Sequence, residues 1–180
     1  MAKAYDGSSP HASRLTERVR QGHGAAMTID APHDPMQRAL AEARAAANMG
    51  EVPVGAVVVD SAGRIVAAAG NRVESLHDPT AHAEILALRE TAKRLESPRL
   101  VNCDLYVTLE PCAMCAQAIS LARIRRLYYG APDPKGGGVA HGARVFSQAT
   151  CHHRPEIYDG IAESDAAELL RDFFAARRGD

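Results

Sequence analysis

Two short motifs, T-A-H-A-E at residues 80–84 and P-C-A-M-C at residues 111–115, constrain the fold of this chain more than any other feature. His82 supplies an imidazole, and Cys112 and Cys115 supply two thiols spaced to lie on one face of a helix's first turn. This donor set, with no obvious fourth ligand, is typical of a catalytic zinc site that keeps one position open for water. The fold must therefore bring two distant segments of the chain together.

Glu84 follows His82 by two positions, so the two side chains do not share a helical face. The carboxylate is therefore a poor fourth ligand but a good candidate to carry protons beside the open position. Both motifs are expected at helix starts, because Asp78-Pro79-Thr80 precedes the first and Glu110-Pro111 precedes the second. Free backbone N–H groups and helix dipoles at such ends would stabilise thiolates and a hydroxide.

Two other interpretations of the cysteine pair remain open. A structural zinc site needs a fourth ligand, for which the sequence offers Cys103, Cys151, His152 and His153. A redox pair is the second alternative, although no thioredoxin-like βαβ pattern surrounds the two cysteines. We interpret Cys103 and Cys151 as structural thiols rather than as a second metal site. H-x-E at one helix start and P-C-x-x-C at the next together match the pattern of zinc-dependent nucleobase deaminases.

Composition and charge are those of one globular domain. The chain has 180 residues, of which 46% are hydrophobic and 24% charged, and its formal net charge is −1. This balance argues against a generally basic nucleic-acid binder, so any such contact must come from a local patch. We expect no membrane association, because no apolar run could span a bilayer and residues 1–20 lack the apolar region of a secretory signal. Cysteines without an export signal indicate reduced thiols in the cytoplasm.

The chain divides into an N-terminal extension, residues 1–34, and a folded domain, residues 35–180. The extension mixes Gly, Ser, His, Pro and charges without an apolar period, so we predict a flexible segment with at most a short helix from Leu15 to Gln21. The domain opens where Asp34 can cap a helix that has Pro35 at its first position.

Hydrophobic periodicity predicts alternating strands and helices through this domain. The predicted strands are 52–59, 65–69, 104–109, 125–130 and 156–161, the first two forming a hairpin. The predicted helices begin at Pro35, at each of the two motifs and at Ala162; a loop is expected at 73–79 and a long glycine-rich loop at 131–145. This order predicts an α/β fold with a mixed central sheet of about five strands and helices on both faces.

Further stretches carry a family resemblance. They are E-V-P-V-G-A-V-V-V at 51–59, G-N-R at 70–72, D-P-T-A-H-A-E-I at 78–85, L-Y-V-T-L-E-P-C-A-M-C at 105–115, D-P-K-G-G at 133–137 and D-F-F-A-A-R-R at 172–178. From about Pro35 to Arg178 the chain resembles the bacterial tRNA-specific adenosine deaminases of the cytidine-deaminase-like superfamily. The resemblance implies the three-layer α/β/α fold of that superfamily and a cytoplasmic, zinc-dependent hydrolase that acts on a cyclic amidine.

The resemblance also implies roles for individual residues. It implies one zinc ion per subunit, bound by His82, Cys112 and Cys115, with Glu84 as the proton shuttle. Zinc-activated water would attack C6 of adenosine at the wobble position, 34, of a tRNA anticodon and yield inosine. The implied substrate-binding residues are Asn71, which matches the position that hydrogen-bonds the flipped base, and Ala83, Lys135, Phe173, Arg177 and Arg178. The implied partners are the anticodon stem-loop of tRNA and a second copy of the chain, because family members are homodimers.

The remaining points concern specificity and alternatives. T-L-E-P-C favours adenosine over the guanine deaminases, which share D-P-T-A-H-A-E, and His152 replaces an asparagine that many relatives carry. The alternative within the superfamily is a free-base or nucleotide deaminase that acts on guanine or cytosine. From another class, the chain could be an RNA- or protein-binding module with structural zinc, but Glu84 argues against this because such a site has no use for it. Of Phe173 and Phe174, we expect at most one to face RNA.

Overall fold

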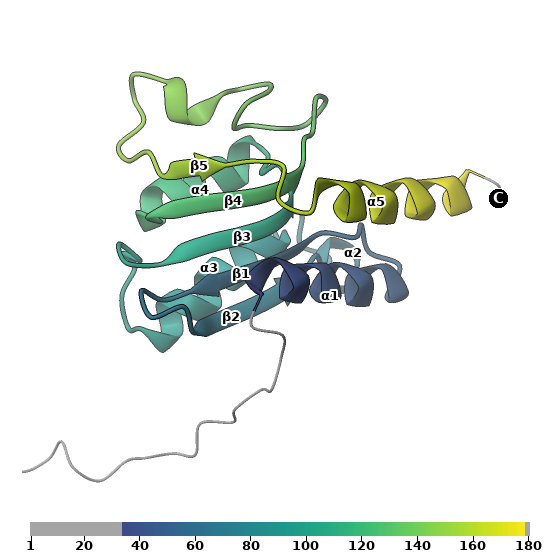
Figure 1. Ribbon diagram of the computed structural model, residues 1–180, viewed down its shortest axis with the longest axis horizontal. Helices are drawn as coiled ribbons and strands as arrows, with labels where there is room; N and C mark the ends of the chain where they lie inside the picture. Colours follow the sequence, from purple (N-terminus) through teal and green to yellow (C-terminus); the bar gives the residue numbers. More distant parts are fainter. Residues whose placement is uncertain (1–33, 179–180) are drawn as a thin grey trace, which may run out of the picture. The chain divides into compact units, whose positions relative to one another are not determined.

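The computed structural model describes residues 34–178, so the predicted N-terminal extension before Asp34, with its expected helix at Leu15–Gln21, lies outside the described residues. The elements in chain order are α1 (Pro35–Asn48), β1 (Gly55–Val59), β2 (Ile65–Gly70), α2 (Val73–Leu76), α3 (Ala83–Arg94), β3 (Asp104–Leu109), α4 (Ala113–Ala122), β4 (Arg126–Ala131), the 3₁₀ turn η1 (Val145–Ser147), β5 (Glu156–Tyr158) and α5 (Glu163–Arg177) (Figure 1). In this part of the chain, no helix is long and apolar enough to cross a membrane.

The five strands form one mixed sheet in the order β2-β1-β3-β4-β5, which confirms the predicted sheet. β1 pairs antiparallel with both β2 and β3, whereas β3 pairs parallel with β4 and β4 parallel with β5. Helix α4 makes the crossover between the parallel strands β3 and β4, as expected for a strand–helix–strand unit. The predicted last strand, β5, lies at the edge of the sheet and ends at Tyr158 rather than at residue 161.

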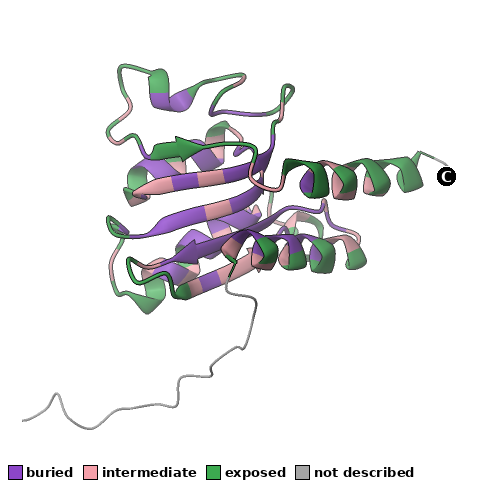
Figure 2. Cartoon of the chain, in the orientation of Figure 1, coloured by how far each residue is buried: buried purple, intermediate pink, exposed green. Residues whose placement is uncertain are grey.

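Helices cover both faces of the sheet. α1 and α5 lie on one face and α3 and α4 on the other (Figure 1). Every residue of β1 is buried, because its side chains alternate between these layers (Figure 2). Ala56 and Val58 pack with residues of α3 and α4, and Val57 and Val59 pack with α1. The core therefore consists of two apolar layers with the sheet between them.

Helix α1 begins as predicted. Asp34 caps it, because its Oδ1 accepts a hydrogen bond from the Met36 N–H at 2.9 Å, and Pro35 occupies the first position. α1 lies so close to β1 that a Cβ added to Gly55 would come within 1.9 Å of the Ala39 carbonyl oxygen. Glycine at this position therefore permits the close packing of helix on strand.

Two predicted segments differ in the structure. The first strand begins at Gly55 and not at Val52, because Pro53 has no N–H to donate and the Val54 N–H bonds instead to the Val52 oxygen at 2.8 Å. The expected loop at 73–79 contains the short helix α2. Its free N–H groups are capped by the carboxylate of Glu51, which is distant in sequence, so no local pattern predicts this helix.

The apolar residues of two helices are only partly buried. Leu95 ends α3 as its C-cap residue and is 45% exposed. On α5, Ala166 is buried, whereas Phe174 is 45% exposed and Leu169, Leu170 and Phe173 are half-buried. The C-terminal half of α5 thus leaves apolar surface open beside the site described next.

Candidate active site

The structure brings the two motifs together as the sequence predicts. His82 is the N-cap residue of α3, Cys112 is the N-cap residue of α4, and Cys115 lies in the first turn of α4. The His82 Nδ1 atom lies 3.7 Å from Cys112 Sγ and 3.5 Å from Cys115 Sγ. All three donor atoms lie within 4.8 Å of one another, which is close enough for one ion to bind all three.

This donor set fits zinc with one coordination position left over. Within residues 34–178, no other group of three His, Cys, Asp or Glu side chains converges in this way, and no fourth such side chain joins this one. Two of the four candidate fourth ligands contact other groups: Cys151 Sγ lies 3.1 Å from the His153 carbonyl oxygen, and His153 Nε2 lies 2.6 Å from the Ile124 carbonyl oxygen. The geometry favours a catalytic metal site over a structural one.

Cys112 is the thiol of the pair that gives up its proton more readily. Hydrogen bonding to Cys115 and then to His82 outweighs burial and lowers the pKa of Cys112 to about 4. The hydrogen bond to Cys112 raises the pKa of both Cys115 and His82. A thiolate at the start of a helix is the form that binds a metal ion.

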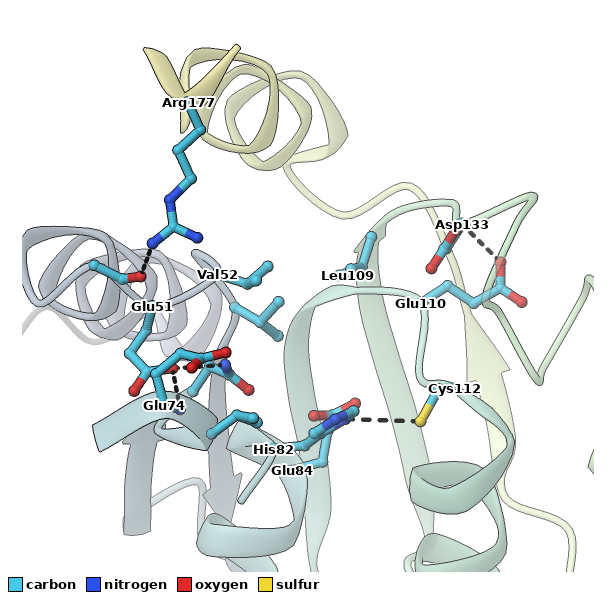
Figure 3. A pocket seen from close by; sticks show the side chains of 14 residues that line it. Glu51, Val52, Glu74, His82, Glu84, Leu109, Glu110, Cys112, Asp133 and Arg177 are labelled. Atoms are coloured by element: carbon cyan, nitrogen blue, oxygen red, sulfur yellow. Dashed lines mark hydrogen bonds between the residues drawn. The ribbon is translucent and has the colours of Figure 1, made fainter. Parts of the chain in front are cut away.

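Glu84 is the second residue of α3 and is almost fully buried. Burial raises its pKa, and none of the ion pairs among the described residues involves its carboxylate. The side chain lines the same cavity as His82 and Cys112 (Figure 3). A carboxyl group with a raised pKa and no ion pair is suited to accept a proton and to release it again.

The cavity beside these residues has a volume of about 290 Å³, at the small end of the range for ligand sites. Its polar wall consists of Glu51, Asn71, Glu74, His82, Glu84, Glu110, Cys112, Asp133 and Arg177 (Figure 3). Asn71, for which the resemblance implies contact with the base, lines this cavity. Its main chain is held beside the metal ligands, because the Arg72 N–H donates to the carbonyl oxygen of Ala81 at 3.0 Å.

Sequence reasoning missed two buried carboxylates of this wall. The side chain of Glu51 accepts hydrogen bonds from the Asn71 amide and from the start of α2. Glu110 precedes the P-C-A-M-C motif, and its oxygens accept hydrogen bonds from the backbone N–H groups of Asp133, Val139, Ala140 and His141 and lie 2.7 Å from His141 Nδ1. Only the position of Glu110 inside T-L-E-P-C could have indicated a role, because its partners lie more than twenty residues away.

Glu110 holds the glycine-rich loop against the metal site. The loop follows β4, and its Gly138 N–H donates to the Pro111 carbonyl oxygen at 2.8 Å. Gly137 also forms a β-bridge with Cys112. Burial opposes the charge on Glu110, but the hydrogen bonds from the loop outweigh it and lower the pKa of this carboxyl. The position of the ligand Cys112 therefore depends on a loop that an ionised carboxylate organises.

A wider groove of about 830 Å³ adjoins the cavity and shares Val52, Leu109, Asp133 and Arg177 with it. Its basic lining residues are Lys135, Arg171, Arg177 and Arg178. The structure therefore brings together three of the predicted substrate-binding residues, Lys135, Arg177 and Arg178. Arg177 also donates a hydrogen bond to the Gly50 carbonyl oxygen, which links α5 to the rim of the cavity (Figure 3).

The other predicted contacts are placed differently. Phe174 lines the groove. The ring of Phe173 packs edge-on against the ring of Phe174, with 5.4 Å between the ring centres. The guanidinium group of Arg177 lies over the Phe173 ring, 4.4 Å from its centre. Ala83 is buried at the first position of α3 and lines neither the cavity nor the groove. The contacts of Ala83 and Phe173 with substrate stay predictions.

Comparison with known proteins supports this assignment of the site. Residues 30–131 match the family of the cytidine and deoxycytidylate deaminase zinc-binding region. The chain is 59% identical over 145 residues to the tRNA-specific adenosine deaminase of Agrobacterium fabrum, a match that covers 81% of this chain and 95% of the relative. It is 60% identical, with a TM-score of 0.74, to a solved structure from a study of A-to-I editing by tRNA:A34 deaminases at the wobble position of transfer RNA; that match covers 76% of this chain and 98% of the other.

A second group of solved structures is more distant. The guanine deaminase of Nitrosomonas europaea is 26% identical to this chain, with a TM-score of 0.68. That match covers 81% of this chain and 85% of the guanine deaminase. The fold is therefore shared with free-base deaminases, while the sequence lies much nearer to the proteins that act on tRNA.

Proposed function

This chain belongs to the tRNA-specific adenosine deaminases, within the family that carries the cytidine and deoxycytidylate deaminase zinc-binding region, and from this premise we propose how it acts. It is a zinc-dependent hydrolase that converts adenosine to inosine at the wobble position, 34, of a tRNA anticodon. Water adds at C6 of the base and ammonia leaves. The observation that carries the assignment of roles is the convergence of His82, Cys112 and Cys115 beside the buried carboxylate of Glu84.

His82, Cys112 and Cys115 would hold the zinc ion. When bound, zinc lowers the pKa of a water molecule to about 7 and so supplies a nucleophile at neutral pH. Glu84 would take a proton from the attacking water and pass it to the ring nitrogen of adenine. It would then take the second proton from the hydroxyl group added at C6 and pass it to the amine, which leaves as ammonia. Burial without a cationic partner suits Glu84 to this exchange, because neither of its protonation states is locked by an ion pair.

The substrate contacts that we propose follow the cavity and the groove. Asn71 would hydrogen-bond the flipped adenine in the cavity, and Ala83, which lies between the cavity residues His82 and Glu84, would contact the same base. Lys135, Arg177 and Arg178 would bind phosphates of the anticodon stem-loop in the groove, and their clustering gives a basic patch on a chain whose net charge is −1. Phe173 would contribute an aromatic surface to an unpaired base of the loop.

We also propose a homodimer that works in the cytoplasm. Val101 and Leu121 are 51% and 60% exposed, and they flank in sequence the contact in which the Leu100 N–H donates to the Ala122 carbonyl oxygen at 2.6 Å. An exposed apolar surface of this kind suits a second copy of the chain. Sedimentation equilibrium tests this: a dimer that Leu121→Asp converts to monomer supports the proposal, and a wild-type monomer at micromolar concentration contradicts it.

Parallel incubations test the proposed substrate. The zinc-loaded protein is incubated with tRNA that carries adenosine at position 34, with free guanine and with cytidine, and ammonia is measured in each reaction. Release from the tRNA alone supports the proposal. Release from guanine or cytidine without release from tRNA would instead support the free-base or nucleotide deaminase, whose fold this chain shares.

A further inference from the structure

Glu51 is a fully buried carboxylate in the wall of the cavity, yet it is not among the metal ligands. It lies between α1 and β1, in the segment whose Gly50 oxygen binds Arg177. Its Oε1 accepts a hydrogen bond from the Ser75 N–H at 2.7 Å, and its Oε2 accepts one from the Glu74 N–H at 3.2 Å and one from Asn71 Nδ2 at 3.2 Å. All of its partners thus lie in or beside the turn that carries Asn71.

The main chain of Asn71 is already fixed. Its N–H donates to the Val54 carbonyl oxygen at 2.9 Å, and the next N–H, from Arg72, donates to the carbonyl oxygen of Ala81, which precedes His82. The freedom that remains is rotation of the side-chain amide, which decides whether oxygen or nitrogen faces the cavity. A carboxylate can only accept hydrogen bonds, so Glu51 requires the amide to turn its NH₂ group toward it.

The amide oxygen is then left for the cavity. Asn71 Oδ1 accepts no hydrogen bond from the described residues. No buried side-chain nitrogen or oxygen in that part of the chain lacks a partner, so this oxygen must be accessible from the cavity that Asn71 lines. Rotation of the amide by half a turn would present nitrogen instead and reverse the pattern offered to a base.

We propose that Glu51 is a positioning residue for the deamination: it fixes the orientation of the Asn71 amide, so that its oxygen faces the base in the cavity. The inference rests on the proposed function, in which Asn71 contacts the base. Burial opposes the charge on Glu51, but hydrogen bonds from Ser75 and Glu74 outweigh it and hold its pKa below the ordinary value. Glu51 is therefore ionised at neutral pH, the state in which it can only accept.

A double-mutant cycle separates this role from the capping of α2 by the same carboxylate. The value of kcat/KM for inosine formation in an anticodon stem-loop is measured for zinc-loaded wild type, Glu51→Gln, Asn71→Ala and the double variant. Glu51→Gln should lower kcat/KM by about 10- to 100-fold, because a Gln side chain no longer dictates the amide orientation. In the Asn71→Ala background the same change should cost at most about threefold, because no amide remains to be oriented.

Glu42→Gln is the matched control. The Glu42 carboxylate is half-buried and bonded to Arg38 on α1, outside the cavity, so this variant should keep kcat/KM within about twofold of wild type. Equal losses from Glu51→Gln in both backgrounds would show a purely structural role and overturn the inference, as would no loss at all. A wild-type protein that forms no inosine would instead overturn the proposed function.

A second measurement, made on wild type, tests the inference even if the Glu51→Gln variant does not fold. In ¹⁵N-labelled, zinc-loaded wild type, the side-chain NH₂ signals of Asn71 are identified by their loss in Asn71→Ala. The inference predicts exchange with solvent that is slower than for the exposed Asn48 and Asn102. Equally fast exchange at all three side chains would contradict it, because the NH₂ group would then not be held by Glu51.

Discussion

Three buried carboxylates surround one cavity, and their environments give them different tasks. Glu51 and Glu110 are held below their ordinary pKa by hydrogen bonds from the backbone, whereas burial raises the pKa of Glu84. The first two therefore act as fixed acceptors that shape the walls, and the third is free to exchange a proton. The sequence could indicate Glu84 through its motif, but not Glu51, because backbone partners from distant segments leave no trace in local residue patterns.

The metal site can be tested one ligand at a time. Cys112→Ser and Cys115→Ser should each lose most of the bound zinc, because a hydroxyl replaces a thiolate in a three-ligand site. Cys151→Ser is the control: its thiol meets Ser120 and a carbonyl oxygen, so zinc content should stay at one ion per chain. Zinc is measured by atomic absorption after gel filtration. Loss of zinc from the control would instead indicate a four-ligand structural site.

Glu110 makes stability depend on pH. Its pKa in the folded protein lies below the ordinary 4.5, so its ionised form stabilises the fold above that pH, and this contribution is lost as the pH falls through the folded pKa. Glu110→Gln should lower the free energy of unfolding at pH 7 by about 1–3 kcal/mol, because an amide cannot accept all of the loop's hydrogen bonds. The difference from wild type should shrink in acid.

Urea unfolding at several pH values, with a chelator to remove zinc, measures this difference. Glu156→Gln is the control, because this exposed carboxylate is paired with Arg126 at the surface and its loss should change the unfolding free energy little. A gap between Glu110→Gln and wild type that stays constant down to pH 3 would show that the charge of Glu110 is not what stabilises the loop.

At the scale of elements, local signals were sufficient where they were strong. The cap Asp34 with Pro35, the β-branched strands and the helix starts at the two motifs all predicted elements that the structure contains. No local pattern predicts helix α2, because a carboxylate distant in sequence caps it. On α5, only Ala166 is fully buried, although the helix carries further apolar residues.

The glycine-rich loop provides a prediction at this scale. A Cβ on Gly138 would lie 2.5 Å from the Ala113 nitrogen and 2.7 Å from the Cys112 carbonyl carbon, both backbone atoms at the start of α4. Gly138→Ala should therefore cost about 1–3 kcal/mol by overpacking and weaken zinc binding, because Cys112 must shift. Gly136→Ala is the matched control, since its Cβ would meet only the movable Asp133 carboxylate at 2.9 Å.

Thermal unfolding and zinc affinity, measured on both glycine variants, test the prediction. Gly136→Ala should keep the melting temperature and the zinc affinity of wild type, whereas both quantities should be lower for Gly138→Ala. Similar behaviour of the two variants would mean that the loop can move away from α4 without disturbing the metal site.

At the scale of the molecule, the fold brings together segments that are distant in sequence to form the cavity and the basic groove. The cavity and the basic groove are assembled from the turn after β2, the starts of α3 and α4, the loop after β4 and the end of α5. The sequence could predict the metal ligands because their chemistry is specific. It could not predict which aromatic of α5 lines the groove, because Phe173 and Phe174 differ only in the direction in which the helix presents them.

The groove should bind RNA through its charges. Lys135→Ala and Arg178→Ala should each weaken binding of an anticodon stem-loop and reduce the slope of log K against log salt by about 0.7–0.9, the value for one lost phosphate contact. Arg64→Ala is the control, because Arg64 lies at the hairpin turn, paired with Asp60 and away from the groove. Fluorescence anisotropy at several salt concentrations measures the slopes; unchanged slopes for the groove variants would exclude this surface as the phosphate-binding site.

Sequencing of anticodon position 34 tests the central claim most directly. Wild type and Glu84→Gln are both loaded with one zinc ion per chain, incubated with tRNA that carries adenosine at that position, and compared by the inosine formed. The account predicts inosine at position 34 with wild type and a rate at least about 100-fold lower with Glu84→Gln, because the proton carrier is lost while the metal ligands remain. Equal rates at equal zinc content would contradict the role of Glu84, and the absence of inosine with wild type would contradict the proposed reaction.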